Sequence, residues 1–134
     1  MFLLAVAMYC FSANAQKISA DKVPAAVKAA FQKQYPSVAK VKWEKEKESF
    51  EAEFKLDKVE TSAVFDMAGK LMETEIEIAI TALPQAVKDY VSKNHKGAKI
   101  KEAAKITDAQ GKIMYEAEVK GKDLMFDEQG NFIK

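Results

Sequence analysis

The sequence contains no arginine, so its 21 basic residues are all lysines. The planar guanidinium group of arginine is the usual means of binding phosphate groups and guanine edges through paired hydrogen bonds. The lysines are balanced by 20 acidic residues, and the net charge of +1 provides no field that would attract nucleic acid or an anionic membrane. We therefore expect no nucleic acid among the partners of this protein.

Cysteine and histidine are also scarce, with one residue of each, Cys10 and His95. A His-rich metal site, a Cys-His nucleophile and a CxxC redox pair all need more of these residues. The five glycines form no phosphate-binding loop, and the G-x-S-x-G nucleophile motif is missing. We predict no enzyme activity, no catalytic residue, no cofactor and no metal. His95 falls near the predicted end of a helix, where a cationic or hydrogen-bonding side chain suits the helix dipole.

One long apolar run is present, at the N-terminus. Residues 1–11 are too few to span a bilayer as a helix, and Ala13-Asn14-Ala15 has the small-x-small pattern of a signal-peptidase site. We interpret residues 1–15 as a signal peptide, although no Lys or Arg precedes the run, and predict a periplasmic or secreted mature chain starting at Gln16. Such a chain would have no stable membrane insertion. The alternative is an apolar helix or strand that stays in the fold.

The rest of the sequence contains an internal duplication. VPAAV at 23–27 matches LPQAV at 83–87, FEAEF at 50–54 matches YEAEV at 115–119, and FDMAG at 65–69 matches FDEQG at 126–130. The middle pair is offset by a few residues more than the others, which predicts a longer first hairpin and a shorter later one in the second copy, with the length changes in loops. We predict two repeats, 16–80 and 81–134.

Each repeat is predicted to begin with a helix. Apolar residues recur at helical spacing, at Val23, Val27, Ala30 and Phe31 in the first copy and at Leu83, Val87, Tyr90 and Val91 in the second. Pro24 and Pro84 suit the first turn of a helix, where no intrahelical N–H bond is lost, and Pro36 and Gly97 suit its end. These signals place the helices at 21–35 and 82–96.

After each helix the sequence period changes from about 3.6 to 2, as in β-strands. Phe50, Ala52, Phe54 and Leu56 alternate with charged residues, and Thr74, Ile76, Ile78 and Ile80 alternate with glutamates. Further strands are predicted at 39–45, 59–65, 99–106, 112–119, 122–126 and 131–134. Because the connections are short, neighbouring strands should be antiparallel. The predicted fold class is α+β, with two tandem units of one helix and four antiparallel strands.

Three connections share the pattern Asp-x-x-Gly, at 66–69, 108–111 and 127–130. A type I turn favours Asp at its first position and Gly at its fourth. A calcium loop would instead supply alternating carboxylates and a distant Glu, which are not spaced that way here. We interpret the three motifs as turns.

The charged faces of the strands supply a candidate binding site. It comprises Lys40, Lys42, Glu51, Glu53, Lys55, Glu73, Glu75 and Glu77. Alternating Glu and Lys is typical of a solvated antiparallel sheet, whereas an acid/base pair of carboxylates is the catalytic alternative. Strand alternation places Trp43 and Phe50 on the same face as Ala52 and Phe54, which favours a role in the core over a role as a binding hot spot.

The VP-x-x-V and LP-x-x-V helix starts, Tyr35-Pro36 and the doubled Phe-Asp-x-x-Gly hairpin together resemble the PepSY-like proteins of the Gram-negative envelope. The resemblance implies a tandem relative of the β-lactamase-inhibitor-protein fold, in which both units form one continuous sheet with both helices on one face. It also implies a periplasmic, non-enzymatic module that binds an envelope protein or peptide through the open face of its sheet, with inhibition of an envelope protein or peptidase as one form of that binding. The alternative is a structural or stress-related envelope protein without a dedicated ligand.

Overall fold

The structure is a computed structural model that describes residues 15–134. Of the predicted signal peptide, residues 1–14 lie outside the described part. Contacts divide the chain into two units, the first ending at Thr74 and the second comprising Glu75–Lys134. We describe each unit by itself. The sequence-based boundary between residues 80 and 81 stays a prediction about the repeat.

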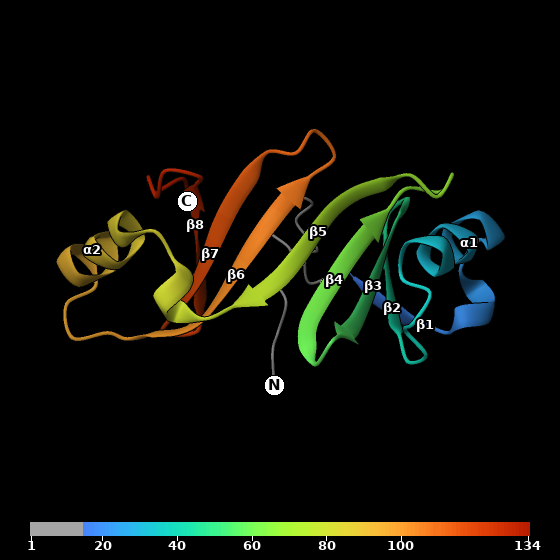
Figure 1. Cartoon of the computed structure of the whole chain (residues 1–134), viewed down its shortest axis with the longest axis horizontal. Helices are drawn as coiled ribbons and strands as arrows, with labels where there is room; N and C mark the ends of the chain where they lie inside the picture. Colours follow the sequence, from blue (N-terminus) through green and yellow to red (C-terminus); the bar gives the residue numbers. More distant parts are fainter. Residues whose placement is uncertain (1–14) are drawn as a thin grey trace. The chain divides into compact units, whose positions relative to one another are not determined.

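Figure 1 shows the helices and strands in chain order. The first unit contains β1 (Gln16–Ile18), η1 (Ala20–Lys22), α1 (Ala25–Gln34), β2 (Lys42–Glu46), β3 (Ser49–Leu56) and β4 (Val59–Phe65). The strand β5 (Leu71–Ile78) crosses the division between the units. The second unit contains η2 (Ile80–Ala82), α2 (Gln85–Asn94), β6 (Ile100–Asp108), β7 (Ile113–Val119) and β8 (Lys122–Asp127). Over residues 15–134 the fold is therefore α+β, with two α-helices.

The strands form one eight-stranded sheet in sequence order, from β1 to β8. Within the first unit, β1 pairs with β2, β2 with β3 and β3 with β4, all antiparallel. Within the second unit, β6 pairs with β7 and β7 with β8, also antiparallel. Equivalent strands therefore meet in equivalent ways, as the duplication predicts. Strand β1 was not predicted, because three residues are too few to establish a period of two.

Both helices are shorter at their N-terminal ends than the predicted ranges 21–35 and 82–96. Pro24 and Pro84 are the N-cap residues, and the residues before them are extended, with ψ of 132° at Val23 and 146° at Leu83. The proline ring disfavours helical backbone in the preceding residue, so the turns η1 and η2 cannot continue into the helices. The predicted helix starts were wrong for this reason.

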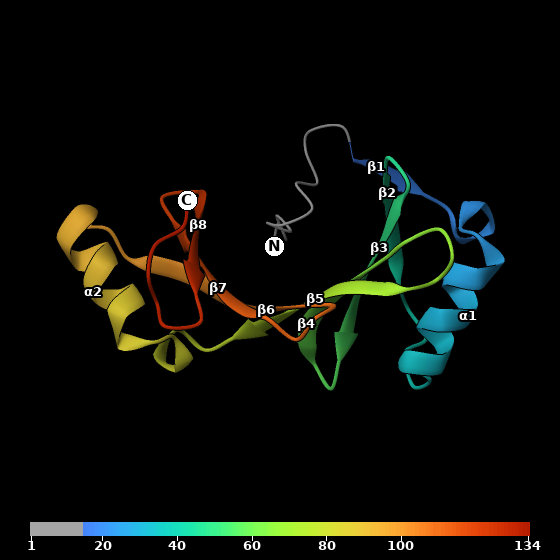
Figure 2. The ribbon, with the colours of Figure 1, turned by 90° about the horizontal axis from the view of Figure 1, so that it is seen from above.

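In the first unit, α1 packs on one face of the sheet through Val27 and Phe31 (Figure 2). The ring of Phe31 lies at the centre of an aromatic cluster, with centroids 5.4 Å from Trp43 and 5.1 Å from Phe54. Phe50 is also buried in this core. The core interpretation of Trp43 and Phe50 is thereby confirmed, and each large buried side chain contributes about 1.5–3 kcal/mol.

In the second unit, α2 packs in the same manner through Val87 and Val91. The sheet side of this core contributes two alanines, Ala103 and Ala117, where the first unit has Trp43 and Ala52 in equivalent register. The buried Phe126 contacts Tyr90 at 5.5 Å between ring centroids. The second core therefore has fewer aromatic side chains against its helix.

The three Asp-x-x-Gly motifs are turns, as predicted. In each turn the Gly amide donates to the Asp carbonyl, at 3.0, 3.0 and 2.9 Å, and the Asp carboxylate accepts two further backbone N–H groups. Gly69 and Gly130 have positive φ, and a side chain there would collide with the first turn of α1 or α2. A Cβ at Gly69 would lie 2.5 Å from the Ala26 carbonyl oxygen. The Phe-Asp-x-x-Gly motif thus places a tight turn in contact with the first turn of each helix.

The later hairpin is shorter in the second unit, as predicted, but the change lies in the strands and not in the loop. The β3–β4 and β7–β8 hairpins both have two-residue tips, and Phe54 pairs with Thr61 where Val119 pairs with Lys122. Each arm of the first hairpin therefore extends about two residues further. An even change keeps every side chain on its original face, whereas a loss of one residue would reverse them.

The predicted strand at 131–134 is replaced by a single bridge between Phe126 and Phe132. Two further backbone hydrogen bonds join Met125 to Ile133 and Lys134, with N···O distances of 2.7 and 2.8 Å. The C-terminus therefore lies along β8, although it forms too few regular pairs to make a strand.

Candidate functional site

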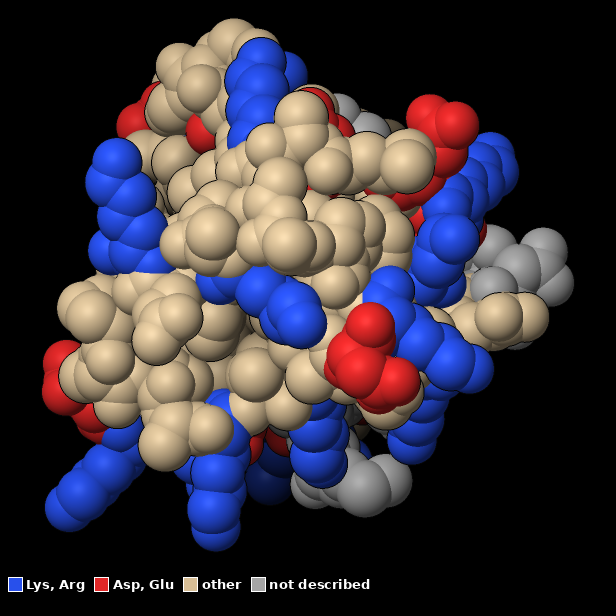
Figure 3. Space-filling model, turned by 90° about the vertical axis from the view of Figure 1, so that its right-hand side faces the viewer, with Lys and Arg blue, Asp and Glu red and all other residues tan. Residues whose placement is uncertain are grey.

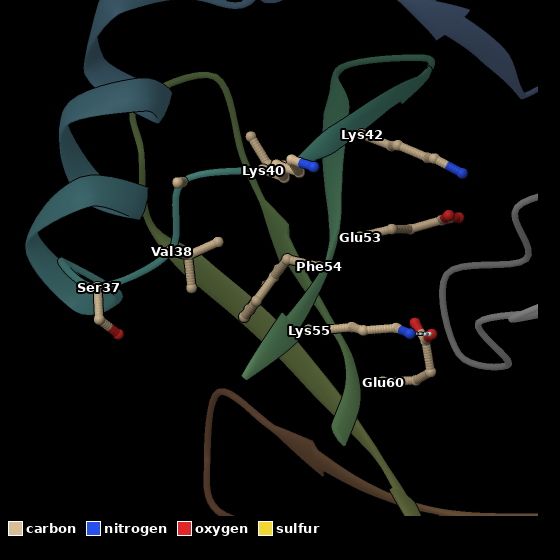
Figure 4. Close-up of a pocket in the computed structure, with 10 residues that line it drawn as sticks. Ser37, Val38, Lys40, Lys42, Glu53, Phe54, Lys55 and Glu60 are labelled. Atoms are coloured by element: carbon tan, nitrogen blue, oxygen red, sulfur yellow. Dashed lines mark ion pairs between the residues drawn. The ribbon is translucent and has the colours of Figure 1, made fainter. Parts of the chain in front are cut away.

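Four of the eight predicted site residues meet on the face of β2 and β3 that points away from α1. Lys42 and Glu53 are register partners, and Glu51 and Lys55 are placed on the same face by strand alternation. Figure 4 shows the side chains of Lys42, Glu53 and Lys55 pointing in one direction and that of Phe54 pointing in the other. Lys40 lies in the connection between α1 and β2. Whether the face binds a partner stays a prediction.

Three glutamates that we predicted on a solvated face are buried. The exposed fractions are 0% for Glu51, 1% for Glu73 and 1% for Glu75. Glu51 is flanked across the strands by its register partners Glu44 and Val64. The prediction of a fully hydrated face was therefore wrong for these residues, while Glu77 is half-buried.

The prediction of an apolar face on β5 is also partly wrong. Ile76 is 41% exposed, and Ile80 lies in η2 and not in the strand. Leu71 packs against the core under α1 and Ile78 packs against the core under α2. Ile76 belongs to neither core. Alternation places a side chain on a face, but a packed helix is needed to bury it.

Burial changes the acidity of these carboxyl groups. Loss of hydration raises the pKa of Glu51 from 4.5 to about 8, and the nearby charges of Glu53, Glu44 and Glu73 add to this rise. The Ser62 hydroxyl opposes the rise in pKa, but it does not meet hydrogen-bond geometry with either oxygen of Glu51. Burial also raises the pKa of Glu53, where Lys42 and Lys17 act in the opposite direction.

Glu44 belongs to this site although we did not predict it. It is the register partner of Glu51, and one carboxylate oxygen from each of Glu44, Glu51 and Glu53 lies within 4.8 Å of the others. In the sequence, Glu44 is separated from Glu51 by seven residues and looks like any other charge in KWEKEK. The β2–β3 register would have revealed it, but the register depends on the exact turn at Lys47 and Glu48.

A groove of about 450 Å³ lies beside these residues, between the α1–β2 connection and the end of β3 (Figure 4). It is lined by Ser37, Val38, Ala39, Lys40, Val41, Lys42, Glu53, Phe54, Lys55 and Glu60. The lining thus contains four of the eight predicted residues together with apolar side chains. Lys55 and Glu60 form an ion pair at 3.5 Å, and both side chains are partly hydrated, so it stabilises the fold little.

The groove exists because β3 is longer than its partner β2. The last β2–β3 pair is Lys42 with Glu53, so in the described part of the chain β3 continues to Leu56 without a partner on that side. The extension of the β3–β4 hairpin supplies Lys55 and Glu60, which form one wall of the groove. The shorter hairpin of the second unit ends at Val119 and Lys122 and offers no such wall.

Figure 3 shows the surface at the α1 end of the first unit. Lysine side chains project around a largely uncharged centre, and acidic side chains are sparse on this face. This side of the unit therefore presents cationic groups to an approaching molecule, in contrast to the carboxylates at Glu44, Glu51 and Glu53.

The second unit has a different charge pattern at equivalent positions. Glu102, Glu118 and Asp123 form a row across β6, β7 and β8, where the first unit has Lys42, Glu53 and Ser62. Burial and the Glu118 charge raise the pKa of Asp123. Ala104 stands opposite Glu116, at the place that Glu44 occupies opposite Glu51.

His95 is the C-cap residue of α2, and its backbone N–H donates to the Val91 carbonyl at 2.8 Å. The helix-end interpretation of His95 is therefore confirmed. Within residues 15–134, no helix combines the length and the apolar character that crossing a membrane would require.

These features define a duplicated α+β protein, in which each unit packs one helix on one face of its strands. The sequence matches the family model described as "Putative beta-lactamase-inhibitor-like, PepSY-like" over residues 10–73 and again over residues 48–134. The chain therefore belongs to the PepSY-like family, as its motifs predicted. A comparison with curated proteins gives no match.

Solved structures of similar fold come from Bacteroides species. A protein from Bacteroides eggerthii, described as "putative periplasmic", has a TM-score of 0.74 and 17% identity, covering 84% of this chain and 86% of its own. A DUF2874 family protein from Bacteroides uniformis has a TM-score of 0.73 and 20% identity, with coverage of 83% and 86%. A BLIP-like protein from Bacteroides fragilis has a TM-score of 0.65 and 24% identity, with coverage of 83% and 84%. At these identities the similarity concerns the fold.

Proposed function

We propose that the protein is an exported, non-enzymatic binding module that holds an extended segment of an envelope protein or peptide in the groove of its first unit. The groove itself carries the proposal, because its lining combines Lys40, Lys42, Glu53 and Lys55 with apolar residues. Its volume of about 450 Å³ lies within the range of binding pockets for small ligands and short segments.

The lining favours a segment with both an apolar and an acidic group. The partly buried Val38 and Val41 offer contacts to an apolar side chain, and Lys40 and Lys42 offer charge to a carboxylate. Among residues 15–134, the stretch of β3 beyond Glu53 has no partner on the β2 side, which would leave its backbone open to an added strand. A peptide backbone supplies the matching donors and acceptors, which a small metabolite does not.

Export and a periplasmic location are part of this proposal. The apolar run at residues 1–11 and the Ala13-Asn14-Ala15 site support a signal peptide. Membership of the PepSY-like family and the "putative periplasmic" description of a structural neighbour point the same way. Sequencing the N-terminus of the protein from its native cells tests the location, and a chain that still begins at Met1 would contradict it.

The proposal assigns no catalytic step to the protein. The residues that line the groove include no histidine or cysteine, and the Lys55 ammonium group is paired with Glu60. A general base and a nucleophile would have to lie within hydrogen-bond reach of each other, and this lining offers no such pair. Inhibition of an envelope peptidase would be one consequence of binding.

Site-specific photocrosslinking in the native envelope tests the groove. A photoreactive amino acid replaces Lys40 in one variant and Lys99 in a control, both at exposed positions in helix-to-strand connections of the two units. We expect a defined partner to be captured at position 40 and not at position 99. The Lys40→Glu/Lys42→Glu variant should bind the purified partner more weakly, and added salt should slow association more than it speeds dissociation.

Two results would overturn the proposal. Equal capture at both positions would mean that the groove does not select a partner. Loss of capture at position 40 in a folded variant, at native expression levels, would favour a structural or stress-related role instead. If the captured protein is a peptidase, its activity with and without this protein shows whether binding is inhibitory.

A further inference from the structure

The carboxylates of Glu44, Glu51 and Glu53 form a compact group on β2 and β3. One oxygen from each lies within 4.8 Å of the others, and Glu44 and Glu51 are direct register partners. Calcium binds oxygen ligands at about 2.3–2.6 Å, so two ligands on opposite sides of one ion are about 4.6–5.2 Å apart. No pair of these oxygens is therefore too far apart to share one ion, and rotation of the side chains would bring all three into contact with a single cation placed among them.

The Glu51 carboxylate provides a second, independent observation. The residue is 0% exposed, and neither of its oxygens has a hydrogen-bond partner within residues 15–134. The buried Ser62 hydroxyl, one strand away, lowers the pKa of Glu51 but does not meet hydrogen-bond geometry with either of its oxygens. In native structures nearly all buried polar atoms have a partner, because an unsatisfied carboxylate is costly to bury. Glu51 lacks the partner that a bound cation would supply.

The neighbouring lysines do not fill this role. Lys17 is the register partner of Glu44, and Lys42 is the register partner of Glu53, yet neither forms an ion pair with the three carboxylates in the described part of the chain. Glu73 also acts on Glu51 and adds negative charge. The local balance of charge around Glu51 is therefore acidic.

We propose that Glu44, Glu51 and Glu53 bind a hard divalent cation of the calcium type. The site offers oxygen donors and no nitrogen or sulfur, which favours Ca²⁺ or a similar ion over Zn²⁺ or Cu²⁺. The site belongs to the first unit alone, because the second unit has Ala104 where Glu44 stands. Because this site needs no protein partner, its test is separate from that of the groove.

The single tryptophan gives a direct readout. Trp43 precedes Glu44 in β2, and its ring is buried on the opposite face of the same strand. Tb³⁺ is a luminescent substitute for Ca²⁺, and excitation of a nearby tryptophan makes the bound ion emit. We expect the purified protein to show Tb³⁺ emission that saturates at one ion per chain and is displaced by Ca²⁺. Added Ca²⁺ should also raise the melting temperature.

Matched variants identify the ligands. Glu51→Gln and Glu53→Gln keep the shape of the side chains and remove a charged ligand, so each should weaken Tb³⁺ binding by at least about tenfold, since affinity depends on the number of charged ligands. Glu118→Gln changes the position equivalent to Glu53 in the second unit and should leave binding unchanged. If Glu51→Gln does not fold, the half-buried Glu44→Gln provides the same test at the edge of the site.

Three outcomes would overturn the proposal. The first is wild-type protein without tryptophan-sensitised emission and with a melting temperature that millimolar Ca²⁺ does not change. The second is equal affinity in wild type, Glu51→Gln and Glu53→Gln. The third is loss of binding in Glu118→Gln alone, which would place the ion in the second unit.

Discussion

The two units share a fold. They differ in the residues on the face of their strands that points away from the helix. At equivalent positions the first unit has Lys42, Glu44 and Ser62, and the second has Glu102, Ala104 and Asp123. The groove and the compact carboxylate group both occur in the first unit. After duplication, the helix-facing side kept its apolar character while the other side diverged, which is the pattern of a scaffold carrying a local site.

A two-unit chain raises the question of whether both cores contribute equally to stability. Phe65 and Phe126 occupy equivalent positions and are both buried. Replacing either by Ala should reduce the free energy of unfolding by about 3–5 kcal/mol, because the substitution leaves a cavity. Urea unfolding followed by far-UV circular dichroism measures the loss. Trp43 fluorescence reports the first unit separately, and different midpoints from the two probes would show that the units unfold independently.

The buried Glu51 should make the stability of the first unit depend on pH. Its folded pKa of about 8 lies above the value of 4.5 expected after unfolding, so folding favours the protonated form. The stabilisation is fully present below about pH 4.5, declines as the pH rises, and is lost above about pH 8. Without divalent cations, wild type should lose roughly 2–5 kcal/mol more than Glu51→Gln over this window.

Unfolding of both proteins in chelator-treated buffer between pH 4 and 9 provides the measurement. Asp123→Asn in the second unit is a useful comparison, because burial raises the pKa of Asp123 in the same direction. Parallel pH profiles for wild type and Glu51→Gln would show that Glu51 is not held protonated by the fold.

Glycine substitutions can distinguish a turn that packs against a helix from a turn with open space beside its glycine. Gly69 and Gly111 both have positive φ, but a Cβ at Gly69 would meet the α1 backbone and one at Gly111 would meet nothing within 4 Å. Gly111→Ala should cost about 1 kcal/mol for its backbone conformation alone, and Gly69→Ala about 2–3 kcal/mol because the turn must also move away from α1. Equal losses in thermal unfolding would argue against close packing of the motif on the helix.

The smallest effect concerns the hairpin tips. Asp57 and Lys58 have φ of 49° and 70°, and Lys120 and Gly121 have φ of 52° and 76°. The second unit thus has glycine where the first has lysine, and such turns favour glycine at this position. Lys58→Gly should stabilise the protein by up to about 1 kcal/mol, whereas Gly121→Lys should destabilise it by a similar amount. Differential scanning fluorimetry of the reciprocal pair checks both signs.

The sequence alone was sufficient for several features of this protein. Alternating apolar residues identified the helix-facing side of β3, and the Asp-x-x-Gly motifs identified three turns, because strand alternation and turn chemistry are local properties. The duplication and the motifs at Pro24 and Pro84 identified the family, although each helix begins only after its proline and not at the predicted start. Apart from the duplication, which compares distant segments, these signals lie within a few neighbouring residues.

The tertiary structure decided which charged residues are buried and which meet. Glu51 and Lys55 have the same alternation in the sequence, yet one is buried at the centre of a sheet face and the other is exposed near a strand end. The partnership of Glu44 with Glu51 depends on the β2–β3 register, and the groove depends on β3 extending past β2. Register and strand length are set by pairing between segments, and burial depends on what covers each face, so neither can be read from one segment alone.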